Sequence, residues 1–235
     1  MKVQPKATLV DYTEDPERNV ATAARLCYSD KDPNQLMEDM SREDIKALVR
    51  KVVDLGHYST LEHTYFFFAV QCSRVTSHQL VRHRVGASYS QRSQRYVKED
   101  EFDYIVPPSI KKNEEASKLF SEKMEEMRKT YSKLLDMDIP KEDARFILPT
   151  IKTNLMVSYN ARSLYHLFEL RCCTRAQWEI RSLAKQMLEQ VKKVAPVLFE
   201  IAGPPCVKEG YCPEGEMSCG RIDDIKTKRE NENNG

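Results

Sequence analysis

Apolar residues recur every three or four positions in several stretches of the chain, and this spacing predicts amphipathic helices. The first helix follows a capping box made by Ser41 and Asp44 and stops at Gly56. The second is capped by Asn113 and ends before Pro140. Their inward-facing residues are Ile45, Leu48, Val49, Val52 and Val53 in the first helix, and Phe120, Met124, Met127, Tyr131 and Leu134 in the second.

Two further helices are predicted in the second half of the chain. One begins after Asn160, and on a face away from its apolar stripe it carries Arg162 and His166 four positions apart, so that both can reach one ligand. The other runs from about Arg175 to Ile201. Their predicted core residues are Leu164, Leu167 and Phe168, and then Ile180, Leu183, Ala184, Met187, Val191 and Val194.

Strands are predicted where aromatic and β-branched residues gather, in 64-TYFFFAVQCSRV-75 and 153-TNLMVSY-159. A short helix from about Ser77 is expected to place Gln79 and Arg82, three positions apart, on one face. This order of elements predicts an α+β fold, a mixed sheet with long helices in a single domain, and it leaves the strand order open.

The chain of 235 residues is long enough to bury a sizeable core. We expect one main domain over residues 1–203 and a tail over residues 204–235, which contains three cysteines and ends in the charged run KTKRENENNG, predicted to be disordered. Neither a signal peptide nor a membrane-spanning run is evident, so the sequence predicts a cytoplasmic protein with reduced thiols and no membrane partner.

The segment 82-RHRVGASYSQRSQRY-96 carries four arginines among three serines and contains no acid. Arginine holds phosphate or carboxylate bidentately, and hydroxyl and backbone N–H groups complete such a cradle. The net charge of +1 argues against a bulk nucleic-acid binder, so this charge indicates a local anion site. The glycines form neither GxGxxG nor a Walker loop. Further arginines that extend the set are Arg145, Arg162, Arg171 and Arg175.

Other interpretations of this segment stay open at this point. The arginines can be surface residues that pair with the acids of the same chain. The segment can also be a basic loop for RNA or single-stranded nucleic acid, with Tyr89 and Tyr96 stacking on bases. Ser93 lies among arginines, but no base is placed beside it, so a hydrogen-bonding role is favoured over a nucleophilic one. The adjacent arginines are expected to favour the neutral form of His83.

The cysteines and the remaining histidines raise the question of a metal. Cys206, Cys212 and Cys219 are spaced C-x5-C-x6-C, and the adjacent Cys172 and Cys173 can supply a fourth thiolate. Structural zinc sites normally use C-x2–4-C pairs, so the spacing is poor. The histidines of 56-GHYSTLEH-63 do not have H-E-x-x-H spacing either. The prediction is therefore that the protein has no metal site, with a zinc-stabilised tail as the alternative.

Three motifs, in order along the chain, resemble those of flavin-dependent thymidylate synthases. Residues 82–96 begin with Arg-His-Arg and reach Ser93 after eight further residues. Upstream lies 56-GHYSTLEH-63, and downstream lies 160-NARSLYHLFELRCCTRAQWEIR-181. The resemblance covers roughly residues 20 to 200 and implies the single-domain fold of that family.

The resemblance also implies an activity. Deoxyuridine monophosphate (dUMP) would be methylated reductively to deoxythymidine monophosphate (dTMP), with methylenetetrahydrofolate as carbon donor, FAD as redox carrier and NADPH as reductant. The expected assembly is a homotetramer whose sites are shared between subunits, and no nucleic-acid partner is expected.

Site residues follow from the same resemblance. Arg171 is the implied catalytic residue, lying against the uracil ring and favouring ionisation of its N3–H. The implied dUMP-binding residues are Gln79, Arg82, Gln91, Arg92, Ser93, Gln94, Arg95, Arg145 and Arg171. The implied FAD-binding residues are Ser59, Arg82, His83, Arg84, Gln91, Asn160, Arg162 and His166. The resemblance assigns no individual role to the spacer, residues 85–90.

Overall fold

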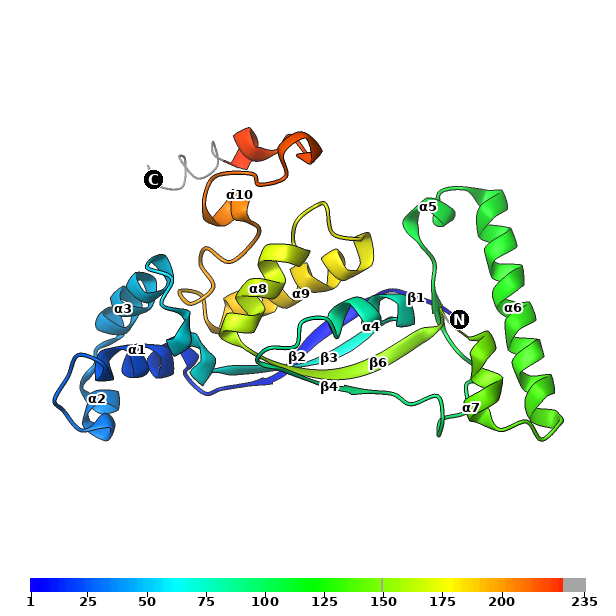
Figure 1. The fold of residues 1–235 in the computed structure, drawn as a ribbon, viewed down its shortest axis with the longest axis horizontal. Helices are drawn as coiled ribbons and strands as arrows, with labels where there is room; N and C mark the ends of the chain where they lie inside the picture. Colours follow the sequence, from blue (N-terminus) through cyan, green and yellow to red (C-terminus); the bar gives the residue numbers. More distant parts are fainter. Residues whose placement is uncertain (149, 226–235) are drawn as a thin grey trace. The chain divides into compact units, whose positions relative to one another are not determined.

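A computed structural model describes residues 1–148 and 150–225 of the chain (Figure 1). They form two compact units: unit 1 holds residues 1–7, 69–82 and 89–157, and unit 2 holds residues 8–68, 83–88 and, of the described residues, 158–225. A four-stranded sheet has the order β2-β3-β6-β4, and each of its strands has residues in both units. These strands are β2 (Lys6–Tyr12), β3 (Tyr65–Ser73), β6 (Lys152–Asn160) and β4 (Ala87–Gln91).

The two strands predicted from the sequence, β3 and β6, are confirmed, and the fold is the α+β fold that was expected. The alternation of buried and more exposed side chains is the pattern of a β-strand with one face in the core. In β3, Phe66, Phe68, Val70 and Cys72 are buried on one face, and the residues between them are less buried. Strand β4 was not predicted, since its sequence ASYSQ lacks an apolar face.

The core of unit 1 lies against the long helix α6 (Glu114–Asp136), which Asn113 caps as predicted by accepting a hydrogen bond from the Ala116 N–H. Helices α5 (Pro108–Lys111) and α7 (Lys141–Ala144) and the 3-10 turn η2 (Arg145–Ile147) contact it. Strands β1 (Lys2–Val3) and β5 (Tyr104–Ile105) pair in parallel. The buried cluster is Phe102, Tyr104, Met124, Tyr131, Ala144, Leu148 and Ile151, with Phe120, Met127 and Leu134 packed against it.

The prediction for the short helix of unit 1 is wrong in its bounds. Helix α4 spans Arg74–Leu80, because the Ser73 hydroxyl accepts a hydrogen bond from the Thr76 N–H and starts the helix directly after β3. Arg82 lies beyond the end of this helix, so Arg82 and Gln79 do not share a helical face.

In unit 2, helices α1 (Pro16–Leu26), α2 (Pro33–Asp39) and α3 (Arg42–Asp54) pack with the 3-10 segment η1 (Tyr58–His63). The capping box of Ser41 and Asp44 is present in both directions, and Gly56 leaves the helix with a φ of 71°. Of the predicted core residues of α3, Ile45, Val49, Val52 and Val53 are buried.

Helix α8 (Ala161–Arg171) is capped by Asn160, as predicted, and buries Leu164, Leu167 and Phe168. Helix α9 spans Trp178–Val194, so the prediction of a helix from Arg175 to Ile201 was too long at both ends. The Gln177 side chain accepts hydrogen bonds from two N–H groups of the first turn, which starts the helix there. The proline at position 196 restricts the residue before it, which ends the helix.

The tail contains helix α10 (Pro205–Lys208) and the 3-10 turn η3 (Gly215–Met217). The predicted disorder of the end of the tail falls on residues 226–235, which lie outside the described residues. The division into a main domain, 1–203, and a tail, 204–235, stays a prediction. Among residues 1–148 and 150–225, every helix is too short or too polar to cross a membrane.

Candidate functional site

The spacer after the Arg-His-Arg triplet forms a turn that leads into β4. Gly86 takes a φ of 65°, and a Cβ at this position would lie 2.3 Å from the Asn160 side-chain nitrogen and 2.5 Å from the Ser163 hydroxyl. The Gly86 carbonyl accepts a hydrogen bond from the Asn160 N–H (2.9 Å), and the Ser163 hydroxyl donates to the Val85 carbonyl. Only glycine fits here, and the turn is thereby fixed to the start of α8.

His83 and Arg171 are joined directly, although they lie 88 positions apart. The Nε–H of Arg171 donates to Nε2 of His83 at 3.0 Å, so the imidazole is neutral and carries its proton on Nδ1. His83 is only 7% exposed, and burial, followed by the charge of Arg171, lowers its pKa to about 4. The predicted preference of His83 for its neutral form is confirmed. The lowered pKa is caused by burial and by the charge of Arg171, however, and not by the adjacent arginines.

Three other predicted flavin residues lie in the same unit. The ring of His166 packs edge-on against that of His83, with centroids 5.8 Å apart. Arg162 forms an ion pair with Glu62 of η1. Ser59, also in η1, is exposed and lines a hollow of about 400 Å³ together with Arg25, Lys51 and His57, among other residues of α1 and α3.

In unit 1, the Gln91 side chain is held at the end of β4. Its amide nitrogen lies 3.2 Å from the Ser77 hydroxyl and 3.3 Å from the Thr153 hydroxyl and donates to both. Ser77 and Thr153 are buried, so this amide is positioned by two rigid elements, α4 and β6.

The loop after β4 turns on Ser93, whose hydroxyl accepts a hydrogen bond from the Arg95 N–H at 3.3 Å. The Arg95 Nε–H donates to the Glu142 carboxylate (2.8 Å), and the Arg145 Nε–H donates to the Glu142 carbonyl (3.0 Å). The structure therefore brings Arg95 and Arg145, which are distant in sequence, to Glu142 of one short helix, α7.

Arg74 and Glu99 were not predicted as site residues. Glu99 is buried, which raises the pKa of its carboxyl group, and it pairs with Arg92 at 3.8 Å. Arg74, at the start of α4, is half-buried, and both burial and the charge of Arg145 lower the pKa of its guanidinium. No sequence motif marks either residue. For Arg74, the only signal in the sequence is its position directly after a buried strand.

Apart from Arg171, the predicted dUMP residues all lie in unit 1, whereas Arg171 lies in unit 2 beside the predicted flavin residue His83. The alternative that surface arginines pair with the chain's own acids holds for some of them. Arg92, Arg95, Arg162 and Arg175 each pair with a carboxylate. Within the described residues, no salt bridge occupies Arg82, Arg84, Arg145 or Arg171.

The arginine, hydroxyl and amide groups of the two units, carried on an α+β fold, are of the kind found in the class of proteins that bind anionic, phosphate-bearing ligands. In the described ranges, no group of three or more His, Cys, Asp or Glu side chains is arranged to hold a metal ion.

Comparison with known proteins narrows the class to a family. The family model "Thymidylate synthase complementing protein" matches residues 8–197. The flavin-dependent thymidylate synthase of Geobacter sulfurreducens is 49% identical over 94% of this chain and 96% of its own, and that of Pyrococcus abyssi is 42% identical over 90% and 91%. The crystal structure of the UMP/dUMP methylase PolB from Streptomyces cacaoi, bound with 5-Br dUMP, matches with a TM-score of 0.76 at 26% identity, covering 85% of this chain and 94% of its own. The chain belongs to the flavin-dependent thymidylate synthase family.

Proposed function

We propose that this chain catalyses the reductive methylation of dUMP to dTMP, with methylenetetrahydrofolate as carbon donor and NADPH as reductant. Membership of the family supports this activity. The observation that carries it in the structure is the contact between Arg171 and the neutral His83, because it holds a fixed positive charge in one orientation beside the Arg-His-Arg turn.

Arg171 acts on the uracil ring by its charge. A guanidinium beside the N3–H favours loss of that proton, which raises the electron density at C5 without a covalent nucleophile. His83 accepts from Nε of Arg171, and no hydrogen bond within residues 1–148 and 150–225 uses the four N–H groups of Nη1 and Nη2, which can therefore face the ring. His83 is thus a positioning residue for Arg171 as well as a proposed contact of the flavin.

The nucleotide phosphate and sugar are proposed to lie on the loop after β4. Ser93 supplies a hydroxyl, Arg92, Arg95 and Arg145 supply charge, and Gln91 supplies an amide whose position Ser77 and Thr153 hold. Arg95 forms an ion pair with Glu142, and Arg92 forms one with Glu99. When phosphate binds, each ion pair must loosen, or the arginine must contact the carboxylate and the phosphate at the same time. The remaining proposed dUMP contacts are Gln79, Arg82, Gln94 and Arg171.

The residues of unit 2 fit FAD by their chemistry. An FAD pyrophosphate needs fixed cations and donors, and Arg84, Arg162 and Ser59 are exposed donors of this kind. The other proposed contacts are His83, Asn160 and His166 in unit 2, and Arg82 and Gln91 in unit 1. FAD supplies the redox chemistry when bound, while the protein binds, orients and shields the reactants.

We further propose that the active form is a homotetramer with sites shared between subunits, working in the cytoplasm, where reduced thiols are the default state.

The test is the absorbance of the purified protein. We expect a flavin spectrum that NADPH bleaches and air restores, followed by dTMP formation when dUMP and methylenetetrahydrofolate are added. UMP is offered in parallel, since the similar methylase PolB is named for both nucleotides. Protein that stays colourless and takes up no added FAD, or that binds RNA in a salt-dependent manner without flavin, would contradict the proposal.

A further inference from the structure

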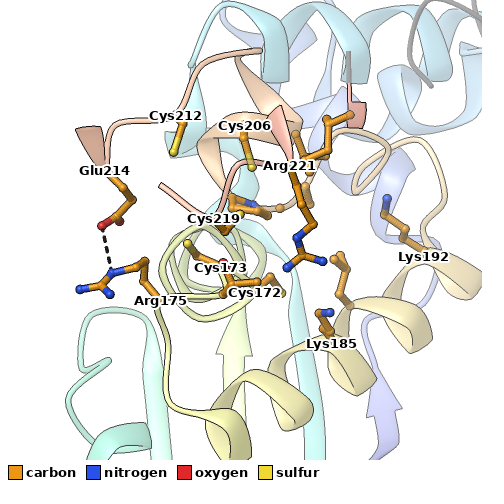
Figure 2. A pocket seen from close by; sticks show the side chains of 17 residues that line it. Cys172, Cys173, Arg175, Lys185, Lys192, Cys206, Cys212, Glu214, Cys219 and Arg221 are labelled. Carbon is orange, nitrogen blue, oxygen red and sulfur yellow. Dashed lines mark ion pairs between the residues drawn. The ribbon is translucent and has the colours of Figure 1, made fainter. Parts of the chain in front are cut away.

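Five of the seven cysteines line one pocket of unit 2, with a volume of about 310 Å³ (Figure 2). Two come from the end of α8, Cys172 and Cys173, and three come from the tail, Cys206, Cys212 and Cys219. The pocket also contains four basic side chains, Arg175, Lys185, Lys192 and Arg221. No disulfide joins any of the seven cysteines, all of which lie in the described part of the chain.

The thiols of this pocket differ in their chemistry. Cys172 is buried, and this burial raises its pKa to about 12, so it stays protonated. Cys206 is half-buried; burial raises its pKa, and the nearby Cys173, Cys212 and Cys219 add to the shift. Cys206 lines the same pocket as these three thiols (Figure 2).

Cys219 has the opposite character. It is exposed, and its pKa is lowered to about 7 by the Thr174 hydroxyl first, and then by the backbone and side chain of Arg221. An exposed thiol with a lowered pKa is deprotonated more often near neutral pH, and the thiolate is the form that reacts with oxidants and electrophiles.

We propose that this pocket is a thiol-modification site, in which Cys219 is oxidised by a peroxide and Cys206 then captures it as a disulfide within the tail. The proposal is independent of the nucleotide chemistry, because none of these cysteines belongs to the proposed dUMP or FAD contacts.

The two steps balance without another reactant. The Cys219 thiolate attacks one oxygen of hydrogen peroxide, the O–O bond breaks, and hydroxide leaves as a sulfenic acid forms. The Cys206 sulfur then attacks the sulfenic sulfur, the S–S bond forms, and water leaves. In total, two thiols lose two electrons and two protons, and peroxide is reduced to two waters.

The expected advantage of Cys219 over an ordinary thiol is modest. With a pKa of about 7 in place of 9.0, the thiolate fraction at pH 7 rises from about 1% to about 50%. The lower basicity reduces the intrinsic nucleophilicity by roughly eightfold, so the net gain in rate is roughly sixfold.

Cys27 provides a matched control, because it is the other exposed cysteine and lies outside the pocket. We expect iodoacetamide at pH 7 to label Cys219 roughly sixfold faster than Cys27 in the reduced full-length protein, as measured by peptide mass spectrometry. Equal rates, or faster labelling of Cys27, would overturn the proposal.

Oxidation is then tested with hydrogen peroxide. We expect a Cys206–Cys219 disulfide in the peptide map. In Cys206→Ser the sulfenic acid at Cys219 should persist and be trapped by dimedone, whereas Cys212→Ser should still form the disulfide. A disulfide of Cys219 with Cys173 or Cys212, or no oxidation at this site, would contradict the assignment.

A bound metal is the competing outcome. If the purified protein carries one equivalent of zinc, and if a chelator is needed before Cys219 can be alkylated, these thiolates are ligands and the proposal fails.

Discussion

Protonation of His83 is expected to destabilise the folded chain as the pH falls. The folded-state pKa of about 4 lies below the ordinary value of 6.5, because the ring is buried and accepts a hydrogen bond from Arg171. Between these values the unfolded chain takes up a proton that the folded chain does not, so the free energy of unfolding decreases as the pH falls from about 6.5 to about 4. Above pH 6.5 the protonation of His83 makes little difference to the free energy of unfolding.

The size of the effect follows from linkage. Between pH 7 and pH 5, the two pKa values give a loss of about 1.8 kcal/mol at most. Arg171 is half-buried, and solvent screening of its charge reduces the expected loss to about 1 kcal/mol.

The assay is urea unfolding of the wild-type protein and of His83→Gln from pH 7 to pH 5. Glutamine offers an oxygen acceptor to Arg171 but does not titrate, so the variant should lose about 1 kcal/mol less than the wild-type protein over this range. His78→Gln, a change at an exposed histidine, serves as the control and should follow the wild-type curve. Parallel curves for His83→Gln and the wild-type protein, or an NMR titration of His83 near 6.5, would refute the reasoning.

Three further changes test other parts of the structure. Gly86→Ala should destabilise the chain by about 3 kcal/mol in urea unfolding, from backbone strain plus overlap with the cap of α8, whereas Gly56→Ala, with open space around it, should cost only about 1 kcal/mol; equal losses would count against the close approach. Arg171→Ala should fold normally but lower dTMP synthesis by about 100-fold or more, and near-normal synthesis would remove Arg171 from its proposed role. Ser93→Ala should weaken dUMP binding by about 10-fold in a titration while turnover persists, and loss of turnover with intact binding would point to Ser93 as a nucleophile.

Features that depend on neighbouring residues were predicted well. The caps at Ser41, Asn113 and Asn160 each act on N–H groups within three residues, so their sequence context is sufficient. Where a local cap was overlooked, the bounds were wrong: Ser73 starts α4 earlier than expected, and Gln177 starts α9 later. A side chain that can cap is visible in sequence, but which of several candidates does so depends on where the preceding strand or turn ends.

The candidate site divides in the same way. The motif at residues 82–96 indicated an anion site and the family, because the kinds of residues needed to bind phosphate are written in one short segment. Their partners are distant in sequence: Glu142 lies 47 positions from Arg95. Neither this partner nor the buried Glu99 is signalled by a motif, since ion pairing depends on which surfaces meet after folding.

By itself, the sequence determined the chemistry that the chain can offer: the arginine and serine segment, the helix caps, the apolar stripes and the cysteines of the tail. Tertiary structure alone decided which of these groups act together. It buried His83 beside Arg171, closed Gly86 onto Asn160, and gathered five cysteines into one pocket. The physical reason is that burial, hydrogen-bond partners and neighbouring charges determine pKa values and reactivity, and all three arise only when distant segments pack together.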